Sequence, residues 1–328
     1  MKNSIVKQID FKNLIGVQIG NAQDENGKTG VTVLYFTQPV KACYDISGGG
    51  PASRETPVLD PQRADTPLNA IVLSGGSAFG LAASDGVMEC LEENNIGFQT
   101  SGGKVPIVVQ SDIYDLTYGN PKCRPDKKMG YDACKNALEK NSPLSGNAGA
   151  GTGATAGKIC GMNRACKTGI GYAAVSLGDL KVGAVVVVNA LGDVFYDRKK
   201  IAGVMNKDRT DFSDCREEMF ELYLKRKNLL AENENTTIGA VITNGDFSKA
   251  QLKKISSMTR NAYARGIKPV GTMGDGDSIY AVSCGEKISA DINVTGTLAA
   301  YAMELAIKDA VVSSKISDKE FLENVSQN

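Results

Sequence analysis

The 328-residue sequence contains no histidine and no tryptophan. The lack of histidine excludes the Ser-His-Asp and Cys-His nucleophile arrangements, imidazole metal sites and the HExxH zinc motif. If the protein is an enzyme, its base must therefore be a lysine, a carboxylate, a tyrosine or an α-amino group. Few catalytic designs meet that condition.

The chain also has no excess of either charge, because 37 Lys and Arg residues balance 37 Asp and Glu residues. It lacks a basic block or stripe, so we expect no nucleic-acid partner. It lacks 18 consecutive uncharged apolar residues, which predicts no membrane span. Charged residues between Lys7 and Lys12 interrupt the start of the chain, where a signal peptide would be apolar, and we expect a cytoplasmic location.

Paired cysteine motifs are missing as well. The eight cysteines are scattered and form no CxxC. In a long chain without a secretion signal, this pattern predicts reduced and mostly buried thiols. A structural zinc site would need close pairs of ligands. We therefore expect neither a metal nor another cofactor.

What the sequence does contain is an alternation of strand-like and helix-like runs. Runs rich in β-branched residues and bounded by Gly, Asn or Asp predict strands at Gly30–Phe36, Ala70–Gly76, Val105–Ser111, Val182–Ala190, Ile238–Asn244 and Ser278–Gly285. Apolar residues spaced three or four apart predict helices at Phe79–Asn95, Asp132–Lys140, Phe212–Glu234, Phe247–Gly266 and Thr295–Ser314. This interleaving is typical of a layered α/β or α+β domain.

The glycine-rich segment GNAGAGTGATAGK, residues 146–158, resembles a phosphate-binding loop but does not match one. A Walker A loop needs Gly where Thr152 stands and Ser or Thr where Ile159 stands. Three interpretations stay open: a dinucleotide loop, a tight backbone turn built from small residues, and a pocket wall of backbone N–H groups.

A second glycine-rich segment, LSGGSAFGL, residues 73–81, lies between a predicted strand and a predicted helix. Backbone amides at a helix start lack partners within the helix and attract negative charge. The amides around Gly75 and Gly76 could therefore form an oxyanion hole or a carboxylate site. Ser77 lacks the GxSxG context of a hydrolase nucleophile.

Thr236 stands between the polar run AENEN and the apolar run IGAVITN. If the Asn235–Thr236 bond is broken, Thr236 gains an α-amino group whose pKa is about 7.7–8.0, so part of it is neutral near pH 7. That amine can act as the base for its own hydroxyl, a design that needs no histidine. Taken alone, however, Asn-Thr could equally be a turn followed by the start of a strand.

Ordered motifs over most of the chain make this junction specific. They are GKTGVTVLYF, GGGPASRET, NAIVLSGGSAFGLAASDGV, VPIVVQSDIYDL, GNAGAGTGATAGK, KTGIGYAAV, VVVNALGDV, NTTIGAVITN and GDGDSIYAVSCG. With these motifs the sequence resembles the DmpA-type family of N-terminal-nucleophile hydrolases. That family includes L-aminopeptidase/D-esterases, β-aminopeptidases and the nylon-oligomer endohydrolase.

The resemblance implies one domain over residues 1–328 that folds as a four-layer αββα sandwich and cuts itself into parts 1–235 and 236–328. The hydroxyl of Thr236 would attack the carbonyl of Asn235, giving an N-to-O acyl shift and then hydrolysis. The two parts would stay together, and homo-oligomers, as a tetramer of αβ units, are expected from the family.

The resemblance also assigns roles to individual residues. Lys167 matches the family's active-site lysine, which would keep the amine of Thr236 neutral and orient its hydroxyl. Asn189, at the end of a predicted strand, matches the residue whose side-chain NH₂ would donate to the oxyanion.

The resemblance also implies a carboxylate pair and an active-site tyrosine. Asp275 and Asp277 match a carboxylate pair that would orient the amine and assist self-cleavage, and their i, i+2 spacing puts both on one side of an extended segment. A turn or a cation site is the alternative for this pair. Tyr114 is the choice for the active-site tyrosine, with Tyr131 as its competitor.

The predicted function is therefore hydrolysis of amide bonds in small peptides or amino-acid-derived oligomers, including nylon-type 6-aminohexanoate oligomers, through an acyl-enzyme. Two alternatives stay open: an acyltransferase of the ornithine acetyltransferase type, and an unprocessed, non-catalytic binding protein. The GGSAFGL motif favours the hydrolase.

Overall fold

A computed structural model describes residues 5–226 and 235–326. Its centre is a ten-stranded mixed sheet, with β2 (Val17–Asp24) paired to β3 outside the main path. Along that path the order is β1 (Lys7–Ile9), β11 (Ile170–Leu177), β12 (Leu180–Asn189), β15 (Thr236–Gly245), β17 (Ser278–Ile288), β3 (Thr29–Ile46), β5 (Leu68–Ser74), β8 (Val108–Asp112) and β4 (Ala52–Arg54).

The long strand β3 divides this sheet into two halves. Its first part pairs with β2 and β5, and its last part pairs with β17. The register shifts between Tyr35 and Val40, where Thr37, Gln38 and Pro39 are exposed. Apolar side chains of both halves, among them those of β3, β5, β12, β15 and β17, form one buried cluster. The two halves therefore face each other as the inner layers of a sandwich.

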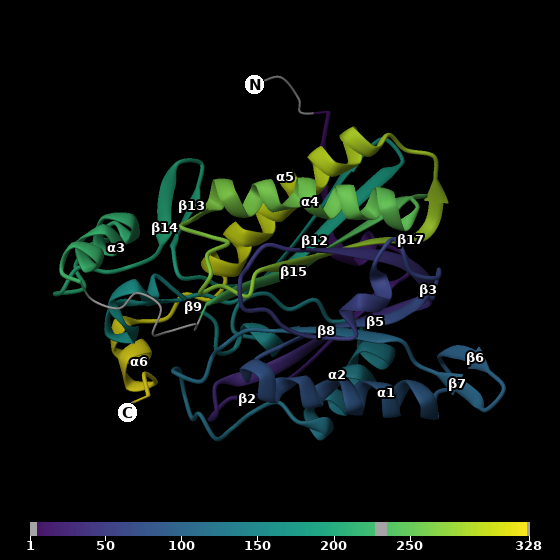
Figure 1. Cartoon of the computed structure of the whole chain (residues 1–328), viewed down its shortest axis with the longest axis horizontal. Helices are drawn as coiled ribbons and strands as arrows, with labels where there is room; N and C mark the ends of the chain where they lie inside the picture. Colours follow the sequence, from purple (N-terminus) through teal and green to yellow (C-terminus); the bar gives the residue numbers. More distant parts are fainter. Residues whose placement is uncertain (1–4, 227–234, 327–328) are drawn as a thin grey trace.

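Helices cover the outer face of each half (Figure 1). The pair α4 (Lys249–Gly266) and α5 (Ile292–Val312) packs on the half that contains β11, β12 and β17. The pair α1 (Ala83–Glu93) and α2 (Lys127–Lys140) packs on the half that contains β2, β3, β5 and β8. Separate apolar clusters lie between each helix pair and its sheet half. The predicted αββα sandwich is therefore confirmed.

Local sequence determines where these elements begin and why they are buried. β15 lies between β12 and β17 and is buried along nine of its ten residues, which explains its almost unbroken apolar run. α4 begins with a capping box, in which Ser248 and Gln251 satisfy each other's backbone N–H groups. α5 is capped by Asp291, the residue before it, whose carboxylate accepts two backbone N–H groups of the first turn.

Smaller elements surround the sandwich. They are the hairpin of β6 (Phe98–Thr100) and β7 (Gly103–Val105), the pair β9 (Thr155–Ala156) and β10 (Cys166–Lys167), the sheet of β13 (Asp193–Tyr196), β14 (Lys199–Ala202) and β16 (Ile267–Lys268), and the helices α3 (Cys215–Leu224) and α6 (Asp318–Glu323). The helix predicted over Phe212–Glu234 is seen as α3, and its last eight residues lie outside the described residues. Among the described residues, no helix is both long and apolar enough to span a membrane.

Candidate active site

The predicted nucleophile lies at the first residue of β15. Thr236 pairs in register with Asn189 on the neighbouring strand β12. On the other side of β15, the strand β17 runs parallel and begins directly after Asp277. The topology therefore brings three residues that are far apart in the sequence to one end of adjacent strands, at the centre of the sheet.

The chain is continuous at the Asn235–Thr236 junction, and this junction is buried. Asn235 is 3% exposed and Thr236 is 5% exposed. The hydroxyl of Thr236 donates to the carbonyl oxygen of Asn235 at 2.5 Å. The backbone N–H of Gly276 donates to the same oxygen at 2.9 Å. The nucleophile therefore lies against the carbonyl group that it would attack, and that carbonyl is already polarised by two donors.

Asp275 and Asp277 flank this contact and are both buried. One oxygen of Asp277 accepts the N–H of Thr237 at 2.6 Å, and the other accepts the N–H of Gly271 at 2.9 Å. Asp275 accepts both the N–H and the hydroxyl of Thr272. Burial raises the pKa of both carboxyls, and the neighbouring Asp275 helps to raise that of Asp277 to about 7.

Asn189 is fully buried and is held by both ends of its amide. Its NH₂ donates to the backbone oxygen of Tyr114 at 2.8 Å, and its side-chain oxygen accepts the N–H of Thr155 at 3.1 Å. These contacts bring Tyr114 and the glycine-rich segment to the end of β12, next to Thr236. Tyr131, the competitor for the tyrosine role, lies on α2 in an outer layer, where its hydroxyl donates to Glu93.

A lysine that sequence reasoning did not select also lies here. Lys158, the last residue of the glycine-rich segment, is 5% exposed and donates to the backbone oxygen of Asn189 at 3.1 Å. Its charge lowers the pKa values of Asp115, Asp275 and Asp277, against the larger effect of burial, which raises all three. Lys158 is therefore the cation that acts on the carboxyl pair beside the nucleophile. Its signal in the sequence was its place at the end of GNAGAGTGATAGK.

Lys167, the lysine selected from the sequence, has different surroundings. Its ammonium donates to three backbone oxygens, those of Gly151, Ala154 and Thr168. Burial, helped by the charge of Lys28, lowers the pKa of Lys167 to about 7. Its contacts among the described residues are with the glycine-rich segment, with Thr168 and with the ring of Tyr118, and not with Thr236. These contacts do not test the prediction that Lys167 is the active-site lysine, and Lys158 is a second candidate for that role.

The segment around Gly75 and Gly76 has its amides already occupied. The N–H of Gly75 donates to the oxygen of Gly30 at 2.9 Å. The N–H of Gly76 donates to the carboxylate of Asp115 at 2.7 Å. Both N–H groups therefore have acceptors within the chain, and their role as oxyanion donors stays a prediction.

The glycine-rich segment 146–158 is likewise tied to the fold by its backbone. The N–H of Gly149 donates to the side chain of Gln23, and the N–H of Ala150 donates to the hydroxyl of Thr32. A Cβ at Gly151 would lie 2.3 Å from the backbone nitrogen of Ile170, so this position requires glycine. Of the three interpretations left open, the close backbone turn describes these contacts.

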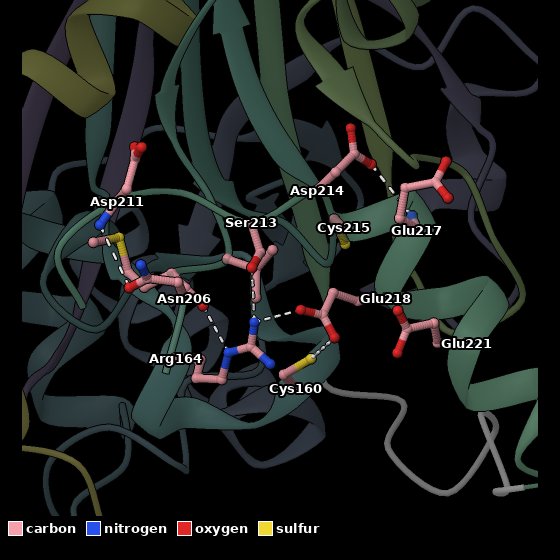
Figure 2. A network of polar contacts seen from close by, with 12 residues as sticks. Cys160, Arg164, Asn206, Asp211, Ser213, Asp214, Cys215, Glu217, Glu218 and Glu221 are labelled. Carbon is pink, nitrogen blue, oxygen red and sulfur yellow. Dashed lines mark hydrogen bonds and ion pairs between the residues drawn. The ribbon is translucent and has the colours of Figure 1, made fainter. Parts of the chain in front are cut away.

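A second polar network lies beside Lys158 and reaches α3 (Figure 2). Glu218 of α3 points between Arg164 and Cys160, forms an ion pair with the guanidinium and accepts from the thiol at 3.3 Å. Arg164 also donates to the hydroxyl of Ser213 at 3.0 Å. Because Cys160 follows Lys158 by two residues, this network fixes α3 to the turns that carry Lys158.

Comparisons with known proteins give a family and several relatives. The sequence profile of peptidase family S58 matches residues 12–319. An uncharacterized aminopeptidase of Mycobacterium leprae is 38% identical over 265 residues, which are 78% of this chain and 71% of the relative. The 6-aminohexanoate-oligomer endohydrolase of Paenarthrobacter ureafaciens is 31% identical over 312 residues, which are 90% of this chain and 84% of the relative.

A solved structure supports the fold independently. The L-aminopeptidase D-Ala-esterase/amidase of Ochrobactrum anthropi, described as a variant of the Ntn-hydrolase fold, superposes with a TM-score of 0.69. The match covers 96% of this chain and 94% of that structure at 16% sequence identity. At this identity the similarity concerns the fold.

Proposed function

The chain belongs to peptidase family S58 and is an Ntn-type amidohydrolase, and from this premise we propose that it cuts itself and uses Thr236 as its nucleophile. The observation that carries the proposal is the 2.5 Å contact between the hydroxyl of Thr236 and the carbonyl oxygen of Asn235. A buried hydroxyl at the first residue of a central strand has little freedom to turn elsewhere. The same residue can then serve both the cut and the later turnover.

The cut begins when the oxygen of the Thr236 hydroxyl bonds to the carbonyl carbon of Asn235. The bond from that carbon to the nitrogen of Thr236 then breaks, and the hydroxyl proton passes to this nitrogen. Water hydrolyses the resulting ester, which returns the hydroxyl and leaves a carboxylate on Asn235. Asp277 accepts the N–H of Thr237 and so fixes the chain directly after the cut.

In turnover, the new α-amine of Thr236 takes the proton of its own hydroxyl as the oxygen attacks a substrate carbonyl. The NH₂ of Asn189 stabilises the oxyanion, and the α-amine passes the proton to the leaving amine. Water then repeats the attack on the acyl-enzyme. Asn235 and Thr236 are both buried in the uncut chain, so Asn235 must move before substrate can reach Thr236.

We assign the role of the active-site lysine to Lys158. Three observations support this choice: its bond to the backbone of Asn189, its burial, and its electrostatic effect on Asp275 and Asp277. A cation at this point disfavours a second positive charge nearby and so keeps the amine of Thr236 neutral. Lys167 then serves to hold the glycine-rich segment in place.

The substrate class is a small peptide or another short amide. The names of the relatives divide this class in two, since one is an aminopeptidase and another acts on 6-aminohexanoate oligomers. We propose that the chain acts on such substrates in the cytoplasm as a homo-oligomer, with the family resemblance as support for the assembly. Light scattering of the purified protein would measure that assembly.

Gel electrophoresis and N-terminal sequencing of the purified protein test the proposal. We expect two fragments, the smaller of which begins Thr-Thr-Ile-Gly. The protein should release the chromophore from an aminoacyl anilide, and acyl transfer from an acyl-ornithine should be slow by comparison. A chain that stays at 34.7 kDa and hydrolyses no amide would overturn the proposal.

A further inference from the structure

The carbonyl oxygen of Asn235 has a second donor besides the hydroxyl of Thr236. The N–H of Gly276 lies 2.9 Å from this oxygen, on the loop that leads into β17. Asn235 and Asp275 form an isolated parallel β-bridge, which holds the loop alongside the junction. During the cut, negative charge develops on this same oxygen. We infer that the Gly276 N–H is the oxyanion donor of the self-cleavage step, an inference that rests on the self-cleavage proposed above.

The space around Gly276 explains why the donor is a glycine. A Cβ at this position would lie 2.9 Å from the hydroxyl oxygen of Thr236 and 3.0 Å from the backbone oxygen of Gly50. Any side chain would therefore displace the nucleophile or the loop behind it. The position has room for a backbone N–H and nothing larger, so the backbone itself supplies the donor.

A second loop, Ser47–Gly50, holds this donor in position. The N–H groups of Ser47 and Gly48 donate to the backbone oxygen of Asp277, at 3.0 and 3.3 Å, and the N–H of Gly50 donates to that of Asp275 at 2.9 Å. A Cβ at Gly48 would lie 2.3 Å from the oxygen of Asp275, so the two loops pack backbone to backbone. A donor fixed in this way needs no rearrangement when charge appears on its acceptor.

This arrangement gives the two reactions different oxyanion donors. Asn189 lies across the sheet on β12 and is held by Tyr114 and Thr155, whereas Gly276 lies on the β17 side of the junction. The Gly276 N–H serves the carbonyl of Asn235, and the side chain of Asn189 serves the carbonyl of the substrate. The loss of Gly276 N–H should therefore slow the cut itself.

Replacement of the Gly276 amide by an ester tests this inference, because it removes the N–H and adds no side chain. Glycolic acid can be placed at residue 276 by nonsense suppression during cell-free synthesis, and the appearance of the two fragments is then followed over time. We expect the cut to slow by roughly 10²–10³-fold, the usual effect of losing one oxyanion donor. The matched control is the same replacement at Gly274, whose N–H donates within its own loop to the hydroxyl of Thr272 at 3.2 Å. That control should cut within a few-fold of the parent.

Processing of the 276 ester at the parent rate would overturn the inference, while a parent chain that never splits would overturn the self-cleavage proposal itself. A second measurement covers an ester chain that does not fold. In the uncut Thr236→Ala chain, hydrogen exchange should show the Gly276 amide strongly protected relative to a solvated amide. Exchange at the solvated rate would mean that the bond to Asn235 is absent, and the inference would then fail without any ester variant.

Discussion

Lys158 and Lys167 lie nine residues apart and are both buried, yet their neighbours differ. The ammonium of Lys167 donates to three neutral backbone oxygens, and the one carboxyl that raises its pKa is that of Asp115. Lys158 reaches the backbone of Asn189 and acts on the carboxyls of Asp115, Asp275 and Asp277. Burial alone therefore does not identify a functional lysine.

The partners of a buried cation determine whether it contributes to stability or to the chemistry of the site. A lysine that satisfies carbonyl groups stabilises the turn that presents them, because an unpaired buried carbonyl costs about 1–3 kcal/mol. A lysine that faces titratable carboxyls changes their protonation and so changes the chemistry beside them. Substitutions can separate these two effects, since the first appears as stability and the second as turnover.

Thr236→Ala gives the largest expected effect and sets the baseline for both lysines. Without the hydroxyl, the chain should remain a single 34.7 kDa band, and turnover of an aminoacyl anilide should fall by roughly 10⁴-fold or more. The matched control is Thr237→Val, because the hydroxyl of Thr237 is buried without a hydrogen-bond partner among the described residues. Thr237→Val should still be cut. A processed and active Thr236→Ala would remove Thr236 from the mechanism.

Lys158→Met should have the next largest effect. Loss of this cation removes the charge that acts on Asp275 and Asp277, and kcat/KM for the anilide should fall by roughly 10²–10³-fold. The pKa of Asp277 should rise further, which would move the pH profile of the remaining activity upward. Lys158→Arg, which keeps the charge, is the control. Parent-like turnover by Lys158→Met would mean that Lys158 is not the active-site lysine.

Lys167→Met should instead act on stability. The substitution leaves three buried backbone oxygens without their donor, and the free energy of unfolding should decrease by roughly 1–3 kcal/mol in urea titrations. Turnover of the folded protein should stay within about tenfold of the parent. If Lys167→Met abolished turnover and left the free energy of unfolding unchanged, Lys167 would act on the chemistry and not on stability, contrary to this expectation.

Asp277→Asn should change how stability depends on pH. The folded pKa of Asp277 is raised to about 7, above the ordinary value of 3.8, so between these values the native state holds a proton that the unfolded chain has released. The stabilising contribution is therefore complete below pH 3.8 and is lost as pH rises toward 7. Urea titrations of uncut Thr236→Ala should show this decline, by a few kcal/mol at most, since one pKa unit is about 1.4 kcal/mol. With Asp277→Asn added, the decline should be weaker, and an equal decline in both chains would contradict the raised pKa.

The smallest effect is expected at the network that fixes α3. The side chains of Arg164 and Glu218 are 17% and 23% exposed, so their ion pair is only partly shielded from water. A double-mutant cycle with Arg164→Gln and Glu218→Gln should give a coupling free energy of about 1 kcal/mol. The cut should slow slightly, because Cys160 and Lys158 share one turn with this network. A coupling free energy near zero would mean that this ion pair does not fix α3 to the turn of Lys158.

Much of the fold could be predicted because its strands are buried on both faces. Val182–Ala190 and Ile238–Asn244 are almost continuously apolar, and they form β12 and β15. The second half of β3 was missed, since Thr37–Pro39 is exposed and breaks the apolar pattern in mid-strand. This break in β3 arises because its two parts pair with different sheet halves, whose strands are distant in the sequence.

The site could be predicted in part from family motifs. The family motifs located the Asn235–Thr236 junction and the Asp275–Asp277 pair, which the structure brings together. They selected Lys167, from the motif KTGIGYAAV, and not Lys158, which was seen only as the end of the glycine-rich segment. What distinguishes Lys158 is its hydrogen bond to Asn189 on β12 and its charge effect on Asp275 and Asp277 before β17, and neither has a local pattern in the sequence.

The position of Thr236 at the start of an interior strand has a consequence for how the mature protein comes apart. A cut there leaves β15 paired with β12 of the other fragment on one side and with β17 of its own fragment on the other. Unfolding of the cut protein would then be the dissociation of two chains, so its melting temperature should rise with protein concentration. The uncut Thr236→Ala fold, as a single chain, should show a weaker dependence, which comes from its homo-oligomeric assembly alone.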